Sequence, residues 1–123
     1  MKMMTNGEIE DKIERLKIQK ENLTVSLPFS VVEKNIRAKG VFYKKIDSFL
    51  LSDLLLYNVE SNYSANEMTM FKSGQGLKLI TLSHSQYVVV QKLLNQKKKE
   101  CSGLDLEMDR LLDLLPENET ENE

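Results

Sequence analysis

The sequence predicts a mainly helical domain that contains a short two-stranded antiparallel ribbon and follows an N-terminal helix. Leu23, Val25 and Leu27 alternate with uncharged polar residues, which is the period of two expected of a strand. Elsewhere, apolar residues recur at helical spacing in segments that begin with capping boxes. The order strand, helix, helix also occurs twice, in residues 23–59 and 77–115, so two such units could pair with each other.

Composition limits the class of protein. The chain has 123 residues, 41% of them hydrophobic and 29% charged, as expected of one globular domain. The net charge of −2 provides no overall attraction to nucleic acid. A single cysteine predicts a reducing, cytoplasmic location. Residues 1–12 lack the apolar core of a signal peptide, and the apolar run at 49–57 is too short to span a membrane, so no membrane contact is expected.

Three regions are expected along the chain. Residues 1–22 form an N-terminal helix or arm, residues 23–115 form the domain with a connection at 60–76, and residues 116–123 form a disordered acidic tail. Thr5 and Glu8 make a capping box for the first helix, and Ile9, Ile13 and Leu16 form its apolar face. This helix lies against the domain or serves as an oligomerisation arm.

In the first unit, the pattern predicts one strand and two helices. Pro28 is expected to end the strand, because proline cannot donate to a continuing ladder. Ser30 and Glu33 form a capping box for a short helix that Gly40 closes. From about Lys44 to residue 57 a second helix is apolar around most of its circumference, which predicts burial. Ile36, Leu50 and Leu54 are expected in the main core.

In the second unit, the strand is expected at 76–83, after a turn at 73–76. It should pair antiparallel with residues 23–27, either within one chain or between two chains. Ser83 and Gln86 form a capping box for a helix to residue 100. Cys101 to Gly103 is expected to break that helix, and residues 104–115 form a second, amphipathic one.

The arrangement of strand, Pro28, helix, Gly40 and buried helix resembles the ribbon-helix-helix family of DNA-binding proteins, the methionine and Arc repressor type, here as a tandem repeat. In that family a paired ribbon enters the major groove. The resemblance implies a sequence-specific DNA-binding protein, either a transcriptional regulator or a plasmid or phage accessory factor, which could form a homodimer. The chain departs from the family at Phe42 and Tyr43, where a small polar residue is usual.

By this resemblance, Asn22, Thr24 and Ser26 would face base edges, joined by Lys78 and Thr81 of the second strand. Lys44 and Lys45 open the second expected helix, where free N–H groups and the helix dipole favour phosphate. These two lysines are therefore expected to contact the DNA backbone.

No enzyme, cofactor or metal site is predicted. His84 is the only histidine and Cys101 the only cysteine, so neither a metal cluster nor a catalytic triad can be assembled from local motifs. The alternative function is a small protein-binding adaptor or inhibitor. It would act through Asp105, Glu107 and Asp109, which give the last helix an acidic face.

Overall fold

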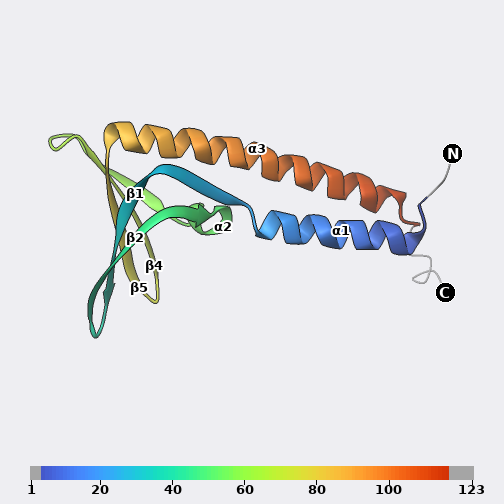
Figure 1. Cartoon of the computed structure of the whole chain (residues 1–123), viewed down its shortest axis with the longest axis horizontal. Coiled ribbons are helices and arrows are strands. Elements are labelled where there is room, and N and C mark those ends of the chain that lie inside the picture. Colours follow the sequence, from blue (N-terminus) through green and yellow to red (C-terminus); the bar gives the residue numbers. More distant parts are fainter. Residues whose placement is uncertain (1–3, 117–123) are drawn as a thin grey trace.

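A computed structural model describes residues 4–116. Two antiparallel helices project from one end of a five-stranded antiparallel sheet (Figure 1). The elements in chain order are α1 (Asn6–Glu21), β1 (Thr24–Arg37), β2 (Gly40–Leu50), α2 (Leu51–Leu54), β3 (Asn58–Asn62), β4 (Glu67–Gly74), β5 (Gly76–Ser83) and α3 (His84–Leu114). The predicted fold class, mainly helical with a two-stranded ribbon, is therefore wrong. The predicted tail lies mostly at 117–123, outside the described residues.

Both long helices begin where their capping boxes predict. Thr5 accepts from the Glu8 amide and Ser83 from the Gln86 amide, and each partner side chain accepts in return from the amide of the capping residue. The predicted break at 101–103 is wrong, because α3 runs through it for 31 residues without interruption. Gly103 lowers helix propensity, but apolar residues of α3 recur at heptad spacing on both sides of it and keep the helix packed. These residues are Leu94, Cys101, Leu104, Met108 and Leu111.

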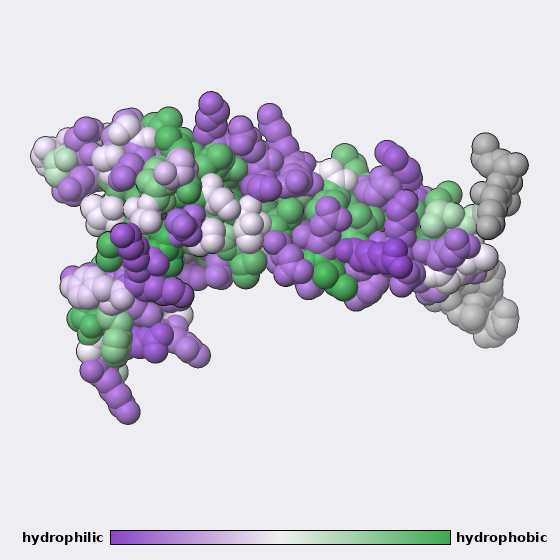
Figure 2. Space-filling model, in the orientation of Figure 1, coloured by the Kyte–Doolittle hydropathy of each residue, from purple (hydrophilic) through white to green (hydrophobic). Residues whose placement is uncertain are grey.

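Packing between α1 and α3 follows that heptad pattern. Ile9 and Ile13 of α1 form a separate buried cluster with Met108 and Leu111 of α3. The N-terminal half of α3, here called its proximal half, covers the sheet instead. Figure 2 shows hydrophobic side chains along the helical pair, flanked by hydrophilic ones. In the described part of the chain, no helix is long and apolar enough to cross a membrane.

The helices predicted at 30–40 and 44–57 are mostly strands. Pro28 does not end β1, because the register shifts between Ser26 and Val31 and the irregularity accommodates a residue that cannot donate. Gly40, with φ of +147°, follows a two-residue hairpin turn and caps no helix. The only helix in this region is the short α2.

The strand order is β2-β1-β5-β4-β3, antiparallel throughout. β1 and β5 are antiparallel neighbours, as predicted, but the paired residues of β1 are 33–36, opposite 77–80. Of the predicted partner, residues 23–27, Leu23 precedes β1 and residues 24–27 form the N-terminal end of that strand, where residues 24–26 pair with β2.

The main core forms between one face of the sheet, α2 and the proximal half of α3. Its most buried side chains include Val25, Ile80, Leu82 and Val90. Leu54 is buried as predicted, since it anchors α2 in this core. The prediction for Leu50 was wrong, because its side chain is 42% exposed beside the buried Leu51. Ile36 is half-buried but lies outside the main core, because it points to the other face of the sheet, so this prediction was wrong as well.

Candidate functional site

The sheet has one covered face and one open face. Cross-strand partners point to the same side, so the register assigns each residue to a face. Ile80 lies in the core and pairs with Met70, which places both on the covered face. The neighbouring Leu79 and Phe71 pair with each other and lie on the opposite side. Seven apolar residues share that side, here called the open face: Val32, Ile36, Val41, Tyr43, Phe71, Leu77 and Leu79.

The open face is exposed and hollowed. Val32 is 54% exposed and Tyr43 66% exposed, although both lie in strands. A hollow of about 560 Å³ lies over this side, lined by both residues together with Leu79, Thr69 and Thr81. Lys34 lies among these residues, opposite Tyr43 and Leu79, so one lysine interrupts the apolar surface. Exposed apolar surface bordered by polar residues is typical of interaction sites in soluble proteins.

Two free strand edges border the open face. Among residues 4–116, no strand pairs with the outer edge of β2 or of β3. Continued by one position beyond Glu33 and Ile80, the register sets Val32 beside Thr81. One row across the open face then runs from Lys45 on β2 to Glu60 on β3 through Val32, Thr81 and Thr69. The two free edges therefore carry opposite charges at corresponding positions.

On the covered face, Tyr57 fastens the segment after α2 to the sheet. Its hydroxyl donates to Glu33 Oε2 at 3.0 Å, and its ring packs edge-on against Phe49 with centroids 6.0 Å apart. Burial, followed by this hydrogen bond, raises the pKa of Tyr57. Lys72 Nζ lies 5.2 Å from the centre of the same ring and 3.4 Å from Asp53 Oδ1. These contacts hold the segment around α2 against the sheet, so Tyr57 has a structural role.

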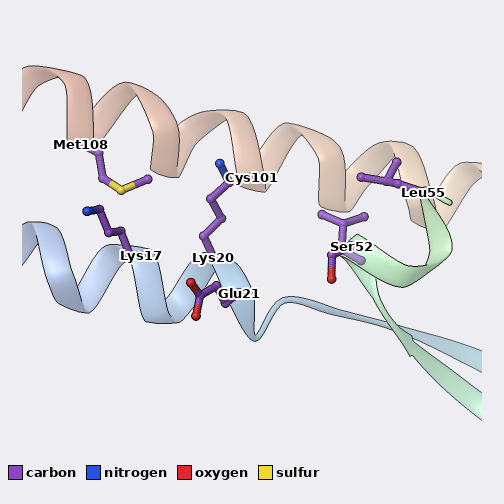
Figure 3. A pocket seen from close by; sticks show the side chains of 8 residues that line it. Lys17, Lys20, Glu21, Ser52, Leu55, Cys101 and Met108 are labelled. Carbon is purple, nitrogen blue, oxygen red and sulfur yellow. The ribbon is translucent and has the colours of Figure 1, made fainter.

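A groove of about 440 Å³ lies where α1, α2 and α3 meet (Figure 3). Lys20 occupies the position at which the apolar pattern of α1 would continue. Its ammonium reaches across and donates to Asp105 Oδ1 at 2.7 Å, and this hydrogen bond raises the pKa of the lysine. Lys17 and Met108 point toward each other across the groove, while Glu21 points away from α3 (Figure 3). The groove thus forms because Lys20, a polar residue, stands in the interface between α1 and α3 where an apolar side chain would continue the packing.

The residues predicted to bind DNA do not lie together in the structure. Asn22 caps the C-terminus of α1, and Thr24 and Ser26 are exposed near the start of β1. Lys44 and Lys45 lie in the middle of β2, so the predicted helix N-terminus at these lysines does not exist. Their side chains point to opposite faces of the sheet, because they are consecutive in a strand.

The two predicted residues of β5 are also separated. Thr81 is on the open face, and Lys78 is on the other side, directly opposite Lys72. A two-stranded ribbon free to enter a groove is absent from residues 4–116, since the predicted second strand is the centre of a five-stranded sheet. The ribbon-helix-helix arrangement is corrected accordingly.

The acidic residues of the predicted protein-binding helix lie in the distal half of α3. Asp105 pairs with Lys20, and Glu107 lies 3.6 Å from Arg110 on the same helix. Asp109 is exposed. Two of the three carboxylates therefore already have partners within the chain.

Chemically reactive groups are dispersed. His84 is exposed at the first turn of α3, and the Cys101 thiol is half-buried beside the groove. Residues 4–116 contain no group of three metal-ligating side chains. The open face is consequently the feature with the clearest capacity for binding.

Sequence reasoning missed the open face, although a signal for it was present. Met68 and Met70 alternate with Glu67 and Thr69 before the Gly74-Gln75-Gly76 turn, and Leu77 and Leu79 flank Lys78 after it, a pattern typical of a hairpin. Residues 60–76 were expected to be a connection, so neither β4 nor its pairing with β5 was predicted.

No protein-family model, curated protein or solved structure matches this chain.

Proposed function

We propose that the chain is a protein-assembly subunit that joins other copies of itself through its free strand edges and its open face. The observation that carries the proposal is the uncovered apolar side of a sheet between two free edges of opposite charge. A free edge offers unpaired N–H and C=O groups to an added strand, and the exposed apolar side chains provide burial. This proposal keeps the alternative function of protein binding but assigns the binding surface to the sheet instead of α3.

Charge selects which edges meet. Pairing two β2 edges around their centre would bring Lys44 and Lys45 against the same lysines of the other copy, which is unfavourable. Pairing β2 with the β3 edge of another copy instead places Lys45 near Glu60. Such a head-to-tail contact forms a ring if its rotation closes. Because sheets twist and coil, sheets joined in this way would curve, and a closed ring would enclose their open faces.

The test is sedimentation velocity of the full chain over a wide range of concentration. The parent protein is expected to form a defined oligomer. Val32→Asp should abolish it, since a carboxylate would be buried in the apolar contact. Lys45→Glu and Glu60→Lys should each weaken association by about two- to fivefold per contact, as expected for exposed ion pairs. The double variant, which exchanges the two charges, should restore it.

Lys44→Glu is the matched control, because this exposed neighbour of Lys45 points to the other face of the sheet. Circular dichroism verifies that every variant is folded. A parent protein that stays monomeric at all concentrations would refute self-assembly. So would an oligomer that is unchanged by Val32→Asp.

A further inference from the structure

Three cationic side chains gather on the covered side of the sheet, at the turn between β4 and β5. Lys72 and Lys78 are direct cross-strand partners, so they point to the same side. Asn35 pairs with Lys78, and Arg37 lies two residues further along β1, on that side as well. Arg37 Cγ would lie 3.0 Å from a Cβ on Gly76, which places the arginine stem directly beside the turn.

Glycines keep the space between these cations open. Gly74 and Gly76 are opposite each other, and only Gln75 separates them along the chain. A Cβ on Gly74 would meet no atom within 4 Å. A cavity of about 320 Å³ lies here, with Arg37, Lys72 and Lys78 in its wall and Leu56 as an apolar side.

The charges in this cavity are not balanced locally. No carboxylate lines it within the described residues. Lys72 is partly compensated by Asp53, 3.4 Å away, and Arg37 lies over the Phe42 ring at 5.8 Å. Lys78 has no ion pair within residues 4–116. Like charges directly opposite each other in a sheet are destabilising, and an anion held between them would remove that repulsion.

We infer that this cavity, formed by Arg37, Lys72, Lys78 and the Gly74–Gly76 turn, binds a phosphate group. An arginine fork binds two oxygens of an oxyanion at once, and two lysines add point charges from a second strand pair. The three cations and the nearby Asp53 together leave a net positive charge. This charge balances the −1.5 to −2 of a phosphate monoester at neutral pH. A carboxylate brings only one negative charge. The site lies on the opposite side of the sheet from the open face, so it does not depend on self-assembly.

The test is a titration of the ¹⁵N-labelled full chain with inorganic phosphate, with ionic strength held constant by sodium chloride. Saturable shifts are expected at the amides of Gly74 and Gly76. Arg37→Gln and Lys78→Gln should each weaken binding by about tenfold or more, because each removes a charged hydrogen bond. Lys78→Arg should retain binding. Lys44→Gln is the matched control and should bind as the parent does, since this lysine is exposed on β2, away from the cavity. Thermal melts establish that the variants are folded.

One further ligand, phosphoserine, identifies the source of the phosphate group, and acetate tests whether the site requires a phosphate at all. Phosphoserine that binds more tightly than inorganic phosphate would support a phosphate ester as the natural ligand. Equal or weaker binding would support free phosphate. The inference is overturned if acetate binds as tightly as phosphate, if the shifts do not saturate, or if Lys78→Gln leaves the phosphate titration unchanged.

Discussion

Gly76 is the residue whose identity is most strictly required by the backbone. Its φ is +100°, and a Cβ at this position would lie 2.5 Å from the carbonyl oxygen of Ile36. That oxygen belongs to the backbone of the neighbouring strand, so it cannot move aside without disturbing the pairing of β1 with β5. Glycine is therefore needed here both for conformation and for space.

Gly76→Ala should consequently lower the free energy of unfolding by about 1–3 kcal/mol, through backbone strain and a steric clash. Urea denaturation measures this loss. Gly74→Ala is the control, because its Cβ would enter open space, and we expect a change within about 0.5 kcal/mol. Equal effects of the two substitutions would contradict the close approach of β1 to Gly76.

Tyr57 predicts how stability changes at high pH. Its pKa is raised in the folded state above the ordinary value of 10.0, so the folded protein holds this proton more tightly than the unfolded chain does. The contribution is fully present below pH 10.0 and is lost as the pH rises above that value and the unfolded tyrosine ionises.

Urea midpoints measured between neutral and strongly alkaline pH should therefore fall more steeply for the parent than for Tyr57→Phe. Tyr63→Phe serves as a control, because Tyr63 is 91% exposed. Parallel pH profiles for the parent and Tyr57→Phe would show that the phenol does not ionise differently on unfolding.

At the level of elements, sequence periodicity predicted what depends on local interactions. The two long helices begin at Thr5 and Ser83 because a side chain and a backbone amide a few residues apart satisfy each other. The strands β1 and β2 depend on distant partners instead. Ser30 and Glu33 have capping-box spacing, but Glu33 is paired with Lys44 and Ile80 in the sheet and accepts from Tyr57. Tertiary pairing overrode a local signal.

The sequence predicted less of the candidate site than of the helices and strands. Lys44 and Lys45 look equivalent in the sequence, yet a strand sends them to opposite faces. The open face joins residues of β1, β2, β4 and β5, and only the pairing register brings them together. A single sequence contains no direct record of that register.

Gly103 offers a test of the uninterrupted α3. A Cβ there would meet nothing within 4 Å, so Gly103→Ala should raise stability by about 0.4–1 kcal/mol through reduced freedom of the unfolded chain. The measurement is the urea midpoint, with the exposed Ser102→Ala as a control that should change by at most about 0.5 kcal/mol. Destabilisation by Gly103→Ala would indicate a helix break at this position.

For the whole molecule, the important feature is that it has two separate buried clusters. The distal cluster contains Ile9, Ile13, Met108 and Leu111, and the main core lies between the sheet and the proximal half of α3. The smaller cluster buries less apolar surface, so the distal ends of the helices should open at a lower free energy than the sheet does.

Ile13→Ala should therefore speed amide hydrogen exchange in α1 and in residues 104–114 while leaving exchange in β5 unchanged. Mass spectrometry of peptic fragments measures both. Ile18→Ala is the control, since Ile18 is 50% exposed and should alter neither region. Faster exchange throughout the sheet would show that the two clusters unfold as one unit.

The contact between α1 and α3 also bears on the order of folding. Lys20 and Asp105 are 85 residues apart, whereas the hairpins of the sheet join strands that are neighbours in sequence. Closing a long loop costs conformational entropy before its contacts repay it, and proteins fold more slowly as such contacts increase. The helices made from the two ends of the described chain should accordingly meet last. During synthesis, the hairpins can form while the partner of α1 is still inside the ribosome.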